Sequence, residues 1–234
     1  MKHNWTNKSN SKYTNEYKLR RIRGESLPGF NKIFDLIEKK EITLNELGIR
    51  CKCIQFPDKK CDHYYQLRRF PWRFRMAQHC ISFNTDNDNL KFDKETGNCY
   101  EQLGQFFMIW TAFEEYIRMF GVFPSQFSLF IPDAQISNLC RKLRSMDQDN
   151  KLVDFLIKHS KNSSGKKRLK SFKNGNNRWI IIYCQELRNM FAHGTLTANP
   201  NNLEAKEFSK FLTVLNKFFI KQIREHFSEL SIKY

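Results

Sequence analysis

Glycine and proline are scarce in this sequence of 234 residues. It contains 9 glycines and 6 prolines, fewer than a loop-rich β-sandwich or a collagen-like chain would carry, so the composition favours helices. Hydrophobic residues still make up 40% of the chain, and 22 residues are phenylalanine. This is enough apolar material for a folded core, which argues against a fully disordered chain.

Long apolar runs are also absent. The longest, such as 179–184, fall far short of the roughly 20 residues that span a bilayer, and residues 1–7 lack the apolar segment of a secretory signal. We therefore expect a cytoplasmic protein with no membrane partner. In a reducing compartment, an odd count of seven cysteines implies no disulfide framework, and buried thiols are expected unless they bind metal or act in catalysis.

Acidic residues are few compared with basic residues. The chain has 24 aspartates and glutamates against 40 lysines and arginines, which gives a net charge of +16. Such an excess favours a polyanionic partner but says nothing about the fold. Charge alone leaves RNA, DNA and anionic lipid as candidates.

The N-terminal part divides into two regions. Residues 1–27 are polar and basic, which predicts a tail or a loosely docked arm. Within an accessory region, 28–96, the apolar spacing over 30–37 predicts a helix, whereas alternation over 49–54 suggests a strand and 64–80 is aromatic and basic without a clear period. We therefore expect this accessory region to be mixed in structure.

Residues 97–234 carry the clearest helical pattern. Apolar side chains recur at helical spacing over 98–120, 134–160, 179–193 and 208–227. The second of these segments is long enough for one helix or a pair. We therefore predict an all-α fold in which these segments form a four-helix bundle.

The motif that carries chemistry lies at the end of the 179–193 segment. Arg188, Asn189 and His193 form an arginine followed by a polar residue, three further residues and a histidine, at the end of the penultimate helix of the expected bundle. Residues 106–114 also resemble the first long helix of the same kind of domain. This pattern resembles the signature of the HEPN superfamily, and the resemblance covers roughly residues 98–230.

The resemblance implies a HEPN-like bundle that is a metal-independent endoribonuclease, typically a toxin or an antiphage defence effector, and that needs no cofactor. It implies RNA as the substrate and a homodimer in which the motifs of both subunits line one cleft. A protein inhibitor or antitoxin would be a further partner.

The three motif residues suit RNA cleavage. A histidine exchanges its proton near neutral pH, so His193 can take the proton of a ribose 2′-hydroxyl or deliver one to the leaving 5′-oxygen. Arg188 can stabilise the charge that grows on the phosphoryl oxygens, and Asn189 can orient the histidine or the phosphate. Attack by the 2′-hydroxyl makes DNA inert and leaves a cyclic phosphate with a free 5′-hydroxyl.

One copy of the motif is poorly arranged to hold a phosphate by itself. Arg188 and His193 are five positions apart, and at about 100° per residue they point roughly 140° apart on a straight helix. Two copies that face each other across a two-fold axis bring the paired side chains together. We also expect Glu114 to form an ion pair on the surface of its own helix rather than to support the site.

Two alternatives to catalysis remain open. His193 can be an ordinary helix-terminal residue before a glycine, with Arg188 a solvated charge. The chain would then be a non-catalytic HEPN-like RNA-binding or scaffold module. A basic DNA-binding protein rests on the net charge alone.

A basic stretch precedes the motif. No acidic residue occurs between Asp154 and Glu186, and the stretch resembles a mobile loop that could steer an RNA backbone into the cleft. A solvated charged loop with no binding role is an equal alternative. The residues predicted to bind RNA are Lys166, Lys167, Arg168, Lys170, Lys173 and Arg178.

Two further features lie in the accessory region. Cys51, Cys53, Cys61 and His63 are four potential zinc ligands within thirteen residues, but the spacing of familiar zinc knuckles is missing, so buried thiols on a strand, with no metal, are favoured. The second feature interleaves arginines with aromatic residues, which could stack on single-stranded RNA or pack inward with the arginines extending outward. Its members are Arg68, Arg69, Phe70, Trp72, Arg73, Phe74 and Arg75.

Overall fold

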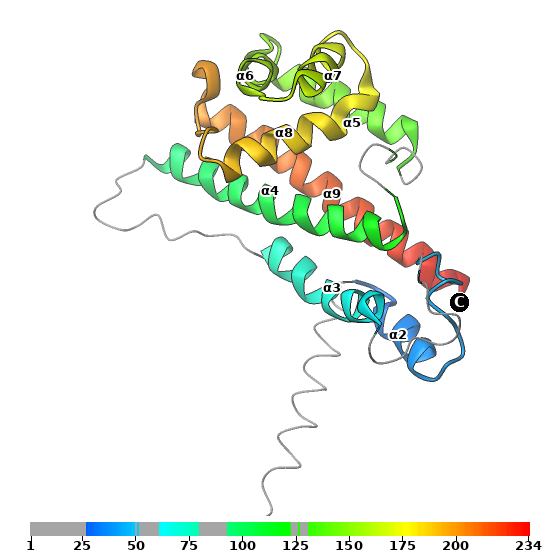
Figure 1. Ribbon diagram of the computed structural model, residues 1–234. Coiled ribbons are helices and arrows are strands. Elements are labelled where there is room, and N and C mark those ends of the chain that lie inside the picture. Colours follow the sequence, from blue (N-terminus) through cyan, green and yellow to red (C-terminus); the bar gives the residue numbers. More distant parts are fainter. Residues whose placement is uncertain (1–26, 50, 52–60, 80–92, 123–125, 127–130) are drawn as a thin grey trace, which may run out of the picture. The chain divides into compact units, whose positions relative to one another are not determined.

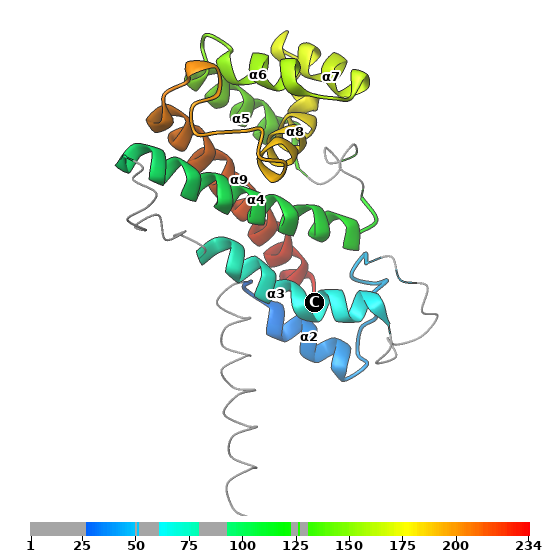
Figure 2. The ribbon, with the colours of Figure 1, turned by 60° about the vertical axis from the view of Figure 1, so that its left-hand side comes forward.

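The computed structural model describes residues 27–49, 51, 61–79, 93–122, 126 and 131–234. The described residues form helices and turns without any strand (Figures 1 and 2), which confirms the predicted all-α class. The chain divides into two compact units, residues 1–75 with 224–234, and residues 76–223. Except for Leu27, the predicted N-terminal tail lies outside the described residues.

The first unit is built on aromatic packing. Helix α2, Phe30–Glu38, matches the helix predicted over 30–37 and buries its apolar face. The ring of Phe30 lies 5.5 Å from that of Phe34 and 5.7 Å from that of Phe227, in the last part of α9, Ala205–Lys233. The ring of Phe34 also stacks on Tyr64 at 5.7 Å, so α2 and the start of α3 share one small core.

The accessory region is not mixed in the part that the structure describes. The segment predicted to lack a clear period forms helix α3, Asp62–His79, with Pro71 inside it. Its buried side chains recur every three or four residues, and the interleaved arginines and the proline obscured that spacing in the sequence. They are Tyr64, Leu67, Phe70, Phe74 and Ala77. Most of the strand predicted over 49–54 lies outside the described residues, and Ile49 and Cys51 belong to no strand.

Stacking of the α3 aromatic residues on RNA bases was one of two alternatives for this segment, and the structure excludes it for Phe70 and Phe74. Both side chains are 0% exposed, and their rings stack on each other at 5.8 Å. Arg68, Arg69 and Arg73 are exposed. For these five residues the structure therefore agrees with the packing alternative, whereas Trp72 and Arg75 are half-buried.

Helix α4, Lys94–Met119, runs through the second unit beside α9. The amide of Asn216 on α9 donates to the Gln102 side chain at 3.1 Å, and farther along both helices the rings of Phe113 and Phe219 lie 4.7 Å apart. Because residue numbers rise together along this interface, the two helices run parallel. Both fall in segments predicted to be long core helices.

Helix α8, Ile180–Ala192, packs on α4 in the opposite direction, since Arg188 contacts Glu114 whereas the later Phe191 contacts the earlier Phe107. The ring of Phe191 lies 6.3 Å from that of Phe107, near the middle of α4. Four buried apolar residues, Ile180, Ile181, Leu187 and Met190, fix the inward face of α8. At the end of the helix, Ala192 and the following His193 are exposed.

The described part of the second unit also contains three shorter helices: α5, Asp133–Met146, α6, Lys151–His159, and α7, Ser163–Lys173. The segment predicted as one helix or two is thus the pair α5 and α6. Short 3₁₀ turns at Asn177–Trp179 and Pro200–Asn202 lead into α8 and α9. Helices α6 and α7 contact each other and both contact α8 (Figure 2).

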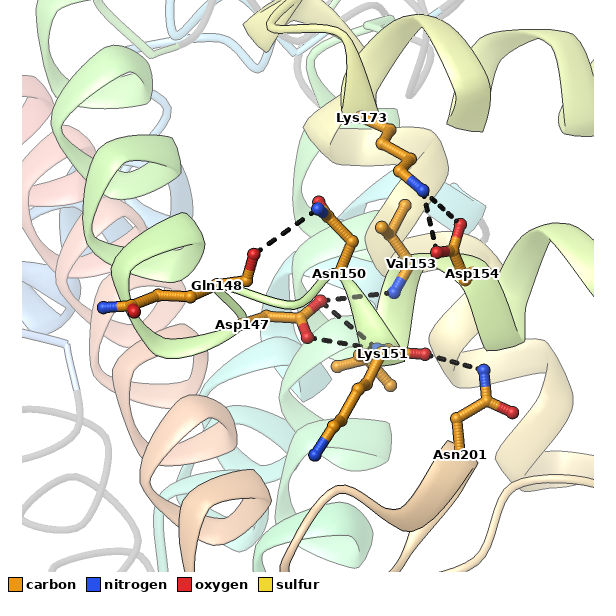
Figure 3. A network of polar contacts seen from close by, with 9 residues as sticks. Asp147, Gln148, Asn150, Lys151, Val153, Asp154, Lys173 and Asn201 are labelled. Carbon is orange, nitrogen blue, oxygen red and sulfur yellow. Dashed lines mark hydrogen bonds and ion pairs between the residues drawn. The ribbon is translucent and has the colours of Figure 1, made fainter.

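Polar contacts fix α6 and α7 (Figure 3). The buried Asp147 carboxylate accepts hydrogen bonds from the backbone N–H groups of Leu152 at 3.2 Å and Val153 at 3.3 Å, which satisfies donors at the start of α6. The Lys173 ammonium lies 2.7 Å from Asp154, which joins the end of α7 to α6. These contacts hold α6 and α7 in place. The connection between the two helices faces the end of α8.

The prediction of a mobile loop between residues 158 and 178 is wrong, because most of this segment forms α7. The Asn162 side chain caps this helix by accepting from the Ser164 N–H at 2.9 Å, and Leu169 and Phe172 are buried. A Cβ at Gly165 would lie 3.0 Å from Glu186, so the glycine allows α7 to approach α8 closely. With so few apolar residues, the helical period was too sparse to detect in the sequence.

In the described part of the chain, no helix combines the length with the apolar character that a bilayer span requires.

Candidate functional site

The predicted motif lies where α8 ends. His193 directly follows the helix, and its backbone N–H donates to the Asn189 carbonyl at 3.0 Å. Gly194 adopts a left-handed conformation with φ of 68°, and the Thr195 N–H returns to the Met190 carbonyl at 2.9 Å. This is the usual glycine-dependent helix ending. It leaves the His193 side chain exposed directly after the helix.

A pocket of about 320 Å³ lies between this helix end and the helices α6 and α7. Its volume is in the range of small-ligand sites. The side chains in its lining that can carry charge or transfer protons are His159, Lys161, Arg168, Glu186 and His193, and the amide of Asn189 adds a hydrogen-bonding group. The fold thus brings two of the three predicted catalytic residues together with one of the predicted RNA-binding residues.

Arg188 does not line this pocket. Its guanidinium Nη2 lies 2.8 Å from Oε2 of Glu114 on α4. The two partners are 74 residues apart in the chain. The Arg188 and His193 side chains therefore point in different directions, as their five-residue spacing on a helix predicts, and only His193 faces the pocket.

The prediction that Glu114 forms an ion pair on the surface of its own helix is wrong. The Glu114 side chain is 8% exposed, whereas that of Arg188 is 24% exposed. Among the described residues, Glu114 Oε1 and Arg188 Nε are also buried without a hydrogen-bond partner. The partner of Glu114 arrives from α8, 74 positions along the chain, so the spacing of residues within one helix does not reveal it. Glu114 is therefore a buried anchor that orients Arg188.

The six predicted RNA-binding residues differ in their surroundings. Lys167, Lys170 and Arg178 are exposed, Lys166 and Arg168 are half-buried, and Lys173 is engaged by Asp154. The guanidinium groups of Arg168 and Arg178 lie 4.9 Å and 4.6 Å from the centre of the Trp179 ring. Trp179 therefore gathers two of these cations beside the pocket.

Two residues near the pocket were missed in the sequence. His159 ends α6 and lines the pocket, and its ring lies 4.4 Å from that of Phe155. No motif surrounds His159, so no signal marked it. Trp179 directly follows Arg178, which was a signal for one cation–π contact, but its contact with Arg168 depends on the turn between α7 and α8.

The candidate zinc ligands also come together in part. Ligand atoms of Cys51, Cys61 and His63 all lie within 4.8 Å of one another, and Cys53 lies outside the described residues. Cys61 precedes α3 and His63 is in its first turn, so the expectation of thiols on a strand is wrong for Cys61.

Three other cysteines match the expectation of buried thiols. Cys99, Cys140 and Cys184 are all buried. Burial raises the pKa of the Cys99 thiol to about 12 and that of Cys140 to about 11. Thiols with such raised pKa values are protonated at neutral pH and are poor nucleophiles. These three cysteines are therefore packing residues.

Comparisons of the chain with models of known protein families, with curated proteins and with solved structures found no match.

Proposed function

We propose that this protein is a metal-independent HEPN-type endoribonuclease that acts as a homodimer. The observation that carries the proposal is the pocket at the end of α8, in which Asn189 and the exposed His193 face the cations Lys161 and Arg168. A proton-transfer group beside cations is what cleavage of a phosphodiester requires.

The reaction needs one base, one acid and charge stabilisation. His193 takes the proton of the ribose 2′-hydroxyl, whose oxygen forms a bond to phosphorus. The bond from phosphorus to the 5′-oxygen breaks, and His159 in the same pocket gives that oxygen a proton. Lys161 and Arg168 stabilise the phosphoryl oxygens, and Asn189 orients the phosphate. The products are a 2′,3′-cyclic phosphate and a 5′-hydroxyl.

A homodimer is proposed because one chain does not present the whole motif to one pocket. Arg188 is held by Glu114 outside the pocket, and a quarter of its side chain remains accessible. When two helix ends face each other across a two-fold axis, this accessible part contacts a substrate that lies on the pocket of the second subunit. Activity then depends on association of the chains.

The Glu114–Arg188 ion pair favours a second candidate function. An arginine engaged by a buried carboxylate is also what a purely structural role produces. In that case the chain is a non-catalytic RNA-binding module that uses the same pocket and the cations around Trp179. This candidate predicts RNA binding without cleavage.

Incubation with labelled RNA and with DNA of the same sequence, both in EDTA, separates the two functions. We expect cleavage of RNA alone, with cyclic phosphate ends, because only RNA supplies the 2′-hydroxyl nucleophile. Light scattering at each protein concentration shows whether activity follows the dimer. Binding without cleavage supports the non-catalytic module. Cleavage of DNA, or full activity of a monomer, contradicts the proposed mechanism.

Charge reversal of Lys166, Lys167 and Arg168 to glutamate is expected to weaken RNA binding by about tenfold or more. Each phosphate contact that is lost also lowers the slope of log affinity against log salt by about 0.7 for single-stranded RNA. Binding titrations at four salt concentrations measure both quantities.

The control variant reverses three exposed lysines elsewhere, Lys39, Lys142 and Lys217, and so makes the same change in net charge. If both variants lose the same affinity and the same salt slope, net charge rather than α7 determines binding. Circular dichroism of both proteins checks the helices, because Arg168 packs on Trp179.

A further inference from the structure

A second cluster of chemically competent side chains lies in the first unit, outside the proposed RNA site. It consists of Cys51, Cys61 and His63, whose ligand atoms all lie within 4.8 Å of one another. The two sulfur atoms are 3.1 Å apart. Cys61 is buried, whereas Cys51 and His63 are half-buried.

The polypeptide around the cluster is held in place by contacts that do not involve the three side chains. The backbone N–H of Cys51 donates to the Asn45 side chain at 2.9 Å. At the start of α3, the Tyr64 hydroxyl donates to the Glu38 carboxylate, and the Tyr64 ring stacks on Phe34. Both sides of the cluster are therefore anchored to α2 and the turn that follows it.

We propose that Cys51, Cys61 and His63 bind a structural zinc ion. Zinc favours thiolate and imidazole ligands at about 2.3 Å and 2.0–2.1 Å in tetrahedral geometry, which places two sulfur ligands about 3.8 Å apart. The observed separations need side-chain movements of about 1 Å to reach this arrangement. Three protein ligands are one fewer than structural zinc sites usually have, and water can fill the fourth position of the tetrahedron.

Zinc bound by these three ligands forms a complex without net charge, which is favourable for a partly buried site. Binding releases one proton from each thiol, so two thiolates and a neutral imidazole hold one divalent cation with no net charge. A neutral complex avoids the cost of an uncompensated charge next to a small apolar core. The zinc therefore adds no charge to a chain that already carries +16.

A structural metal also meets a need of this unit. Its described core consists of the short α2, the first part of α3 and the end of α9, with a few aromatic contacts. Small units of this kind commonly gain folding free energy from a bound metal. Zinc at this cluster would link the residues that follow α2 to the first turn of α3.

The test begins with the full chain, refolded in zinc under reducing conditions and dialysed, with metal content measured by mass spectrometry. We expect about one zinc per chain. Cys51→Ser, Cys61→Ser and His63→Gln are each expected to lower zinc affinity by about tenfold or more. The matched controls, Cys99→Ala in the second unit and His79→Gln at the exposed end of α3, are expected to retain zinc.

Cobalt substitution tests metal binding in the wild-type chain, so its result does not depend on whether a ligand variant folds. The wild-type chain with cobalt alone is expected to show thiolate charge-transfer bands and the intense visible bands of tetrahedral coordination. The proposal would be overturned by a refolded wild-type chain that binds no zinc or by an octahedral cobalt spectrum. It would also be overturned if the Cys51 and His63 variants bound zinc as tightly as the wild-type chain. So would loss of two hydrogens from the mass of the purified chain with no metal bound, which indicates a disulfide.

The zinc site is independent of the RNA pocket, and the two proposals can fail separately. A structural zinc removed by EDTA would lower the melting temperature of the chain without taking part in cleavage. Melting curves with and without EDTA therefore accompany the cleavage assay. Zinc content and cobalt spectra are measured without RNA.

Discussion

Replacing His193 with alanine is expected to slow RNA cleavage by about 100-fold or more, because the variant lacks the base that accepts the 2′-hydroxyl proton. The side chain is exposed beyond the end of α8, so its removal leaves the helical core intact. Single-turnover rates with saturating protein measure the chemical step apart from binding. The melting temperature of the variant checks its fold.

The dependence of the rate on pH separates the two histidines of the pocket. A base must be unprotonated and an acid protonated, so the wild-type profile is expected to be bell-shaped. His193→Ala removes the rise in rate on the acidic side, and His159→Ala removes the fall on the alkaline side. The control is His79→Ala, which changes an exposed histidine outside the pocket and should change neither limb.

Results that contradict these roles are easy to recognise. A folded His193→Ala protein that cleaves RNA at the wild-type rate would exclude His193 from the mechanism. A profile that keeps both limbs in His159→Ala would assign the leaving-group proton to another donor. RNA affinity that falls as much as the rate would point to a binding role for these residues.

Replacing Glu114 with alanine is expected to destabilise the chain by about 3 kcal/mol, because it leaves the Arg188 guanidinium partly buried without its partner. Arg188→Ala should cost a similar amount, since the Glu114 carboxylate is the more deeply buried of the two. Chemical denaturation measures both changes. The control Arg118→Ala removes an exposed arginine from the same helix as Glu114 and should change stability by less than about 0.5 kcal/mol.

A double variant separates a structural role of this ion pair from a catalytic one. Glu114→Gln with Arg188→Met removes both charges at similar volume, so most of the lost stability is expected to return. If Arg188 stabilises the transition state, cleavage stays low although the protein is as stable as wild type. Full cleavage by the double variant would show that the pair serves stability alone and that Arg188 does not contact the substrate.

Local pattern was enough to locate most of the helices and the motif. The apolar stripe of α4 and that of α9 repeat at 3.6-residue spacing, and this spacing is a property of each segment alone. The glycine after His193 likewise predicted where α8 ends, because a left-handed residue is needed there. Where apolar residues are sparse, as in α7, or interrupted by Pro71, as in α3, periodicity does not reveal the helix.

Tertiary packing decided which residues meet. Glu114 pairs with Arg188 across 74 positions of the chain, and His159, Arg168 and His193 reach one pocket from three different elements. Cys51 and Cys61 approach each other because contacts with α2 and the turn after it anchor the chain on either side of them. The physical reason is that periodicity determines the face on which a side chain lies, whereas the partner of that face depends on how the helices pack together.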